Sequence, residues 1–149
     1  MIDLSSLERL AERAEALIGR LESLLPMAPA PDWDAAHAFR WRRRATALGV
    51  QAVLQPVRHV SPIRLSDLKH IAEQKQALEQ NTRQFVAGLP ANNVLLTGSR
   101  GTGKSSLIKA CLNAWAGRGL RLIEVDKDDL VDLPDIVELV AGRPERFIV

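Results

Sequence analysis

One stretch of the sequence combines glycines, a lysine and hydroxyl side chains in the spacing that holds a polyphosphate. It reads Gly98-Ser99-Arg100-Gly101-Thr102-Gly103-Lys104-Ser105. Glycines permit the positive φ angles that turn backbone N–H groups towards an anion. A helix beginning near Gly103 would direct the positive end of its dipole to the same place. The spacing Gly-x4-Gly-Lys-Ser/Thr is the P-loop, or Walker A, pattern, and it predicts a nucleoside triphosphate site.

The polar side chains of this motif have separate expected roles. Lys104 would contact the β- and γ-phosphate oxygens, and the Ser105 hydroxyl would bind the Mg²⁺ that bridges the same oxygens. Ser106 would contact the α-phosphate through its amide or hydroxyl, and Arg100 would either touch phosphate or be solvated. We therefore expect ATP and Mg²⁺ as cofactors, with Ser105 as metal ligand and no catalytic residue identified. GTP stays an alternative, although the sequence has no guanine-specifying Asn-Lys-x-Asp motif.

The motif sits between a predicted strand and a predicted helix, as a phosphate-binding loop requires. Residues 94–97 form a short apolar strand, and the helix after the loop would bury Leu107, Ile108, Cys111, Leu112 and Trp115. A second strand is expected over 120–125, a helix over 134–140 and a third strand from residue 146. This alternation predicts an α/β fold with a parallel sheet.

The N-terminal part is predicted to be helical. Residues 3–25 carry an apolar stripe at heptad spacing, made of Leu4, Leu7, Ala11, Ala14, Ile18, Leu21 and Leu25 and widened by Leu10, Leu17 and Leu24. Such a stripe either packs on its own domain or pairs with a second copy or a protein partner. We favour packing on the same domain. Pro26 would end this helix, and residues 27–32 resemble a linker.

A second, shorter helix is predicted from Asp32 or Asp34 to Arg44. It would carry Trp33, Phe39 and Trp41 among arginines that include Arg40, Arg42, Arg43 and Arg44. Aromatic and arginine side chains together can bind nucleic acid, but buried aromatics beside solvated or paired arginines are the more common arrangement. We favour the second interpretation and expect no nucleic-acid partner.

The next segments are predicted from their breakers and caps. Residues 49–62 would be extended or irregular, and a helix capped by Ser66 would end before Gly88 and Pro90. The apolar side of that helix would be Leu68, Ile71, Leu78, Phe85 and Val86. The chain therefore divides into a helical N-terminal region over 1–58 and the first half of a P-loop domain over 59–149.

Other groups could bind a metal but are better explained structurally. Acidic residues after the second strand, Glu124, Asp126, Asp128 and Asp129, could hold Mg²⁺, but a solvated start to the next helix is favoured. The three histidines have no metal-ligand spacing. Cys111 is expected to be a buried, unreactive thiol.

Composition excludes several classes of protein. The chain has 149 residues, 46% of them hydrophobic, and a net charge of +2. It has no long apolar run that would predict a membrane span and no signal-peptide pattern. A single cysteine fits a reducing compartment, so we expect a cytoplasmic protein.

Much of the chain resembles a bacterial AAA+-type ATPase family that is catalogued only as a domain of unknown function. The likeness is carried by residues 88–96 before the P-loop, by 119–130 after it, and by the run Arg143-Pro144-Glu145-Arg146-Phe147-Ile148-Val149. It extends more weakly through Trp33, Phe39, Trp41 and Arg42. The resemblance implies ATP hydrolysis coupled to conformational work. It also implies an adenine pocket at Leu65, Leu68 and Ile71, beside a position where relatives tend to have glycine and this chain has His70.

The same resemblance predicts what a fragment of such an ATPase would lack. The acidic Walker B pair follows the third strand in that family, so we expect a fragment that ends before Walker B and does not hydrolyse ATP alone. The strand at 94–97 would lack a sheet neighbour, and the second strand would lie at the far edge. The alternatives are a P-loop kinase, which would continue into an acceptor-binding lid, and a non-enzymatic nucleotide-gated interaction module.

Overall fold

The computed structural model describes residues 4–24, 31–46 and 49–149. The helices are α1 (Leu4–Leu24), α2 (Ala72–Val86), α3 (Lys104–Trp115) and α4 (Leu133–Val140), with short 3₁₀ helices η1 (Leu65–Asp67), η2 (Ala116–Arg118) and η3 (Lys127–Asp132). The strands are β1 (Ala38–Thr46), β2 (Gly49–Pro56), β3 (Leu120–Glu124) and β4 (Arg146–Ile148). No helix in these ranges is long and apolar enough to cross a membrane.

The four strands form one sheet in the order β2-β1-β3-β4. β1 and β2 make an antiparallel hairpin. β1 runs parallel to β3, with Ala38 opposite Leu122, and β3 runs parallel to β4, with Leu120 opposite Arg146. The fold is therefore α/β with a mostly parallel sheet, as the sequence predicts.

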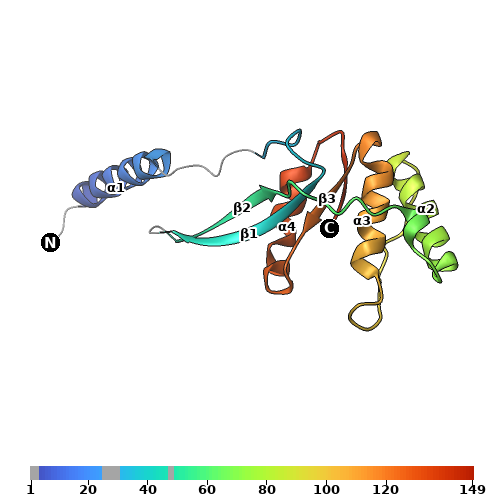
Figure 1. Cartoon of the computed structure of the whole chain (residues 1–149). Helices are drawn as coiled ribbons and strands as arrows, with labels where there is room; N and C mark the ends of the chain where they lie inside the picture. Colours follow the sequence, from blue (N-terminus) through green and yellow to red (C-terminus); the bar gives the residue numbers. More distant parts are fainter. Residues whose placement is uncertain (1–3, 25–30, 47–48) are drawn as a thin grey trace.

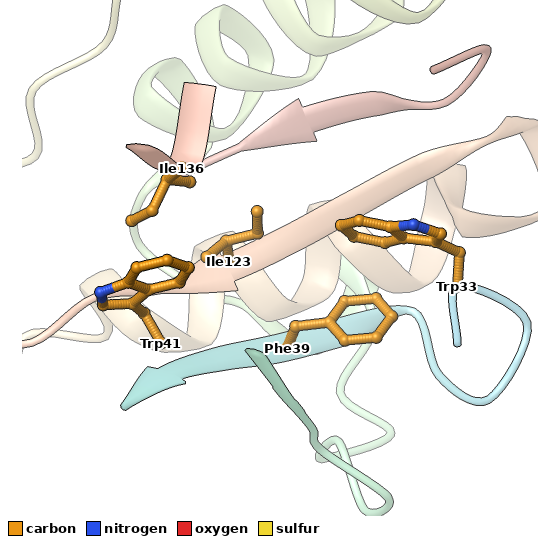
Figure 2. Close-up of a cluster of buried hydrophobic side chains, with 5 residues drawn as sticks. All are labelled: Trp33, Phe39, Trp41, Ile123 and Ile136. Atoms are coloured by element: carbon orange, nitrogen blue, oxygen red, sulfur yellow. The ribbon is translucent and has the colours of Figure 1, made fainter. Parts of the chain in front are cut away.

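One face of the sheet is covered by α4. Phe39 and Trp41 of β1 and Ile123 of β3 point to this face and pack with Trp33 and Ile136 (Figure 2). The Trp33 and Phe39 rings meet edge to face with centroids 5.0 Å apart, an arrangement that aromatic quadrupoles favour. This cluster packs α4 against the sheet.

The opposite face is covered by α3, with α2 beside it (Figure 1). Ala38, Leu120 and Leu122 alternate with the residues of the first face, as strand geometry requires, and they pack against Leu112 and Ala116. The helix that carries the P-loop lysine is therefore fixed to the sheet through its buried side.

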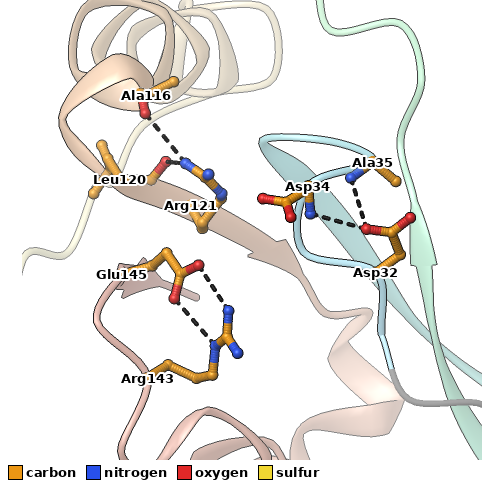
Figure 3. A network of polar contacts seen from close by, with 8 residues as sticks. All are labelled: Asp32, Asp34, Ala35, Ala116, Leu120, Arg121, Arg143 and Glu145. Atoms are coloured by element: carbon orange, nitrogen blue, oxygen red, sulfur yellow. Dashed lines mark hydrogen bonds and ion pairs between the residues drawn. The ribbon is translucent and has the colours of Figure 1, made fainter.

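Short polar contacts fix the connections around β3 and β4 (Figure 3). The Arg121 guanidinium donates to the carbonyls of Ala116 and Leu120 at 3.2 and 3.0 Å, which ties η2 to the strand. Arg143 donates twice to the Glu145 carboxylate, at 3.1 and 2.9 Å, just before β4. This hydrogen bonding by Arg143 lowers the pKa of Glu145.

The helix predicted through Arg44 is wrong, because residues 38–46 form β1. Aromatic and basic residues alternate there with a period of two, which is a strand signal. Asp32 accepts hydrogen bonds from the Asp34 and Ala35 amides and so begins a turn, not a helix. In the described part of residues 1–58 the only α-helix is α1. The domain boundary at 58 stays a prediction, although β1 and β2 share the sheet of the later strands.

The position of the predicted second strand also needs correction. β3 occupies residues 120–124 as expected, but it lies inside the sheet because β1 pairs with its outer side. The helix predicted after Ser66 begins later, at Ala72, with Ile71 at its N-cap position, and Ser66 lies in η1.

Residues 94–97 do not form the predicted strand. They pair with no strand in the described ranges, and a strand exists only through hydrogen bonds to a neighbour. Val94 and Leu96 instead line a groove of about 310 Å³ with Ala77 and Leu78 of α2. Leu95 is 85% exposed.

The favoured interpretation of α1 is also wrong. Leu10, Leu17 and Ile18 are 66%, 58% and 54% exposed, and α1 lies apart from the sheet and its helices in Figure 1. The predictions for Pro26 and for most of the 27–32 linker fall outside the described residues.

Candidate phosphate-binding site

The backbone of the P-loop has the left-handed angles that the sequence predicts for its glycines. Gly98, Gly101 and Gly103 have φ of 135°, 86° and 87°. L side chains rarely adopt such angles. A Cβ on Gly98 would also lie 3.3 Å from the Thr102 hydroxyl oxygen. The backbone geometry at these three positions therefore explains why they are glycines.

The Lys104 side chain closes the loop across its base. Its Nζ donates to the carbonyls of Gly98 and Ser99 at 2.8 and 2.7 Å. The Thr102 hydroxyl donates to the same Ser99 carbonyl at 2.9 Å. These bonds hold a full positive charge against the loop, where no carboxylate neutralises it in the described part of the chain.

The loop leads directly into the N-terminus of α3. Gly103 is the N-cap residue, and within the described ranges no side chain accepts a hydrogen bond from the first turn of the helix. The free N–H groups and the helix dipole both favour an anion there. An open depression of about 490 Å³ lies at this point, lined by Arg100, Gly101, Gly103, Lys104, Ser105 and Ser106.

The structure thus brings the predicted phosphate contacts together. Lys104, Ser105, Ser106 and Arg100 line one depression, and Gly98, Ser99 and Thr102 form the hydrogen-bonded base described above. Ser105 is exposed on the first helical turn, so its hydroxyl is open to solvent.

Residues behind the site fix α3 in place. Leu107, Cys111 and Leu112 are almost completely buried. Asn113 donates to the carbonyls of Ser61 and Ile63, both at 2.8 Å, and so attaches the preceding segment to the helix. Burial raises the pKa of the Cys111 thiol to about 11, which keeps it protonated and confirms the expected buried thiol.

The entry to the loop is held by a contact that the sequence does not predict. Asn81 of α2 donates to the Asn92 carbonyl and accepts from the Asn92 amide, both at 2.8 Å. The side-chain amide of Asn81 therefore replaces the peptide group of a neighbouring strand. No sequence pattern indicates this pair, because the residues lie on different elements.

Two residues of the predicted acidic cluster, Glu124 and Asp126, are paired with arginines. Arg40 contacts Glu124 and Arg42 contacts Asp126, each at 2.6 Å. Asp132 accepts from the Trp41 indole at 2.9 Å. In the described ranges no three acidic, histidine or cysteine residues are placed to hold a metal. These contacts support the structural interpretation both of the acidic residues and of the arginine-rich segment.

The residues predicted to contact adenine precede α2 in the chain, and their role stays a prediction. Leu65 is in η1, and neither it, Leu68 nor Ile71 lines the depression at the P-loop. His70 has φ of 62° and is the one described non-glycine residue with a positive φ. The backbone there has the conformation that glycine adopts at no steric cost.

Comparison with known proteins places the chain in a family. No curated protein and no solved structure matches it. A family model described as "Protein of unknown function (DUF815)" matches residues 34–149, which is well over half of the chain and includes the sheet and the P-loop. The chain therefore belongs to the DUF815 family.

Proposed function

We propose that this protein binds ATP with Mg²⁺ at the loop formed by residues 98–106. The observation that carries the proposal is the Lys104 ammonium, held across a loop of positive-φ glycines at the uncapped start of α3. Oriented amides, a helix N-terminus and a fixed positive charge together favour a polyphosphate over a smaller or less charged anion.

Each group in the depression has a role in this proposal. The amides of the loop and of the first turn of α3 would surround the β-phosphate, and Lys104 would lie against the β- and γ-phosphate oxygens. The Ser105 hydroxyl would be one oxygen ligand of Mg²⁺, which usually keeps several waters and takes the others from substrate phosphates. Ser106 would contact the α-phosphate.

The finer proposal is that the protein is an ATPase of the AAA+ type. It is supported by the resemblance of residues 88–130 to that class and by a mostly parallel sheet covered by helices on both faces. Bound nucleotide would then bias the position of elements attached to α3. The segment that Asn113 attaches, around residues 61–63, is the first candidate.

The test is titration of a fluorescent ATP analogue with Mg²⁺ into the wild-type chain, Lys104→Ala and Lys109→Ala. Both variants remove one lysine from α3, but Lys109 does not line the depression. We expect Lys104→Ala to weaken binding about 10- to 100-fold, the range for hydrogen bonds to a charged group. Lys109→Ala should leave the affinity unchanged.

Two further measurements sharpen this test. Ser105→Ala should reduce the gain in affinity that Mg²⁺ provides, with little effect when the metal is chelated. Competition by unlabelled ATP and GTP then reports the base preference. Equal binding by wild type and Lys104→Ala would refute the proposed site. Stronger competition by GTP would correct the nucleotide but not the site.

A further inference from the structure

We propose that α1 pairs in parallel with α1 of a second copy of this chain. The described residues of its apolar stripe, Leu10, Ala11, Ala14, Leu17 and Ile18, are all exposed. They lie before residue 34, where the family match begins, so this surface is independent of the nucleotide site. An exposed apolar stripe of this kind marks an interaction surface.

The charges beside the stripe identify the partner. An α-helix turns about 100° per residue, which places Ala14 at the centre of the apolar face. Glu8 and Glu15 follow one border of that face. Arg13 and Arg20 follow the other border. One flank of the stripe is therefore acidic and the other basic, and all four charged residues are exposed.

Under two-fold symmetry, the charges of these flanks decide whether the two helices pair in parallel or antiparallel. In a parallel pair the axis lies along the helices, so the acidic flank of one copy meets the basic flank of the other on both sides. In an antiparallel pair the axis lies across the helices, so the acidic flank of one copy would face the acidic flank of the other. Flanking charges of this kind decide partner and direction in coiled coils, and here they select the parallel pair.

The same charges argue against docking on the chain's own domain. The largest group of exposed apolar residues there is on η3 and α4, and it includes Leu130, Val131 and Val137. The same two elements carry the acidic residues Asp128, Asp129, Asp135 and Glu138 and one basic residue, Lys127. Such a surface would attract the basic flank of α1 but repel the acidic flank, whereas a second copy satisfies both.

The length of α1 indicates how stable the dimer should be. The helix has 21 residues, which is three heptads and near the lower limit for a stable two-stranded coil. We therefore expect a dimer that dissociates reversibly on dilution. Two nucleotide-binding domains would then be joined through their N-terminal helices.

The first test is sedimentation equilibrium of the full chain over a concentration series. Leu17→Glu places a charge in the stripe, and the matched control Ala16→Glu places the same charge on the adjacent residue, which lies on the opposite side of the helix. We expect Leu17→Glu to abolish the dimer and Ala16→Glu to preserve it, with equal helicity by circular dichroism.

The second test reverses the charge of one flank at a time. Arg13→Glu with Arg20→Glu makes both flanks acidic, and Glu8→Lys with Glu15→Lys makes both basic. Each double variant should dimerise about tenfold more weakly than wild type, because the ion pairs between the flanks become repulsive contacts. A mixture of the two should recover a heterodimer.

Three results would overturn the proposal. The wild-type chain could sediment as a monomer at every concentration. The charge variants could dimerise as tightly as wild type, which would indicate an antiparallel pair or another interface. Leu17→Glu could lower the unfolding temperature of the domain without changing the mass, which would indicate docking of α1 on its own chain.

Discussion

Asn81 and Asn92 form a reciprocal pair of hydrogen bonds, both 2.8 Å long, between α2 and the segment that enters the P-loop. Residues 94–97 have no strand partner in the described ranges, so this pair is a principal polar attachment of the segment. The position of Gly98 therefore depends on a side chain of a helix that does not itself line the depression at the P-loop.

Asn81→Ala should loosen this attachment. Loss of both bonds is expected to lower the free energy of unfolding by about 1–2 kcal/mol and to weaken nucleotide binding by a smaller factor than Lys104→Ala. The measurements are urea unfolding and the nucleotide titration. Asn93→Ala is the control, because the neighbouring Asn93 takes no part in the pair, and an equal effect of the two variants would contradict the role of the pair.

Gly98→Ala should damage the loop itself. The new Cβ would meet the Thr102 hydroxyl at 3.3 Å, at φ of 135°, so we expect a loss of about 1–3 kcal/mol, typical of a residue in a sparsely populated region. Gly117→Ala is the matched control, since a Cβ at that position would have no neighbour within 4 Å and its φ is not positive. Thermal unfolding of both variants compares them, and similar stability would show that Gly98 is not constrained.

His70→Gly should stabilise the fold. His70 is exposed at φ of 62°, and left-handed backbone costs an L residue roughly 1 kcal/mol that glycine avoids. We expect a higher unfolding temperature for His70→Gly. His59→Gly, at an exposed residue without a positive φ, should lower it. A decrease in both would mean that the His70 side chain makes a favourable contact that outweighs its backbone strain.

Ionisation of Cys111 should lower the free energy of unfolding at high pH. Its pKa is raised to about 11 in the folded chain by burial, above the unfolded value of about 8.5. The folded state therefore keeps a proton that the unfolded state loses, and stability is fully present below about pH 8.5 and is lost as pH rises towards 11. The expected loss across this window is about 3 kcal/mol.

Urea unfolding at several pH values between these limits measures this effect. Cys111→Ala should be less stable at neutral pH because it leaves a small cavity, but its stability should decline less steeply with pH. A parallel decline in the two proteins would assign the pH dependence to other groups.

The local geometry of the predicted phosphate-binding loop could be anticipated from the sequence alone. Their arrangement depends on neighbours along the chain: glycines that accept positive φ, a lysine that reaches back to Gly98 and Ser99, and a helix that begins at once. The same local character explains why α3, β3, α4 and β4 lie within a residue or two of their predicted positions. Helix periodicity and glycine breaks are contained in short windows of sequence.

Strand pairing could be known only from the tertiary structure. Residues 38–46 form β1 because they hydrogen-bond to β2 and to β3, which is distant in the sequence, and that pairing places β3 in the interior of the sheet instead of at its edge. Residues 94–97 are more apolar than residues 38–46 but have no partner in the described chain, and they remain outside the sheet. A helix satisfies its backbone within its own segment, whereas a strand needs another segment to supply donors and acceptors. The pairs Asn81–Asn92 and Arg40–Glu124 depend on the same long-range placement, which no local pattern contains.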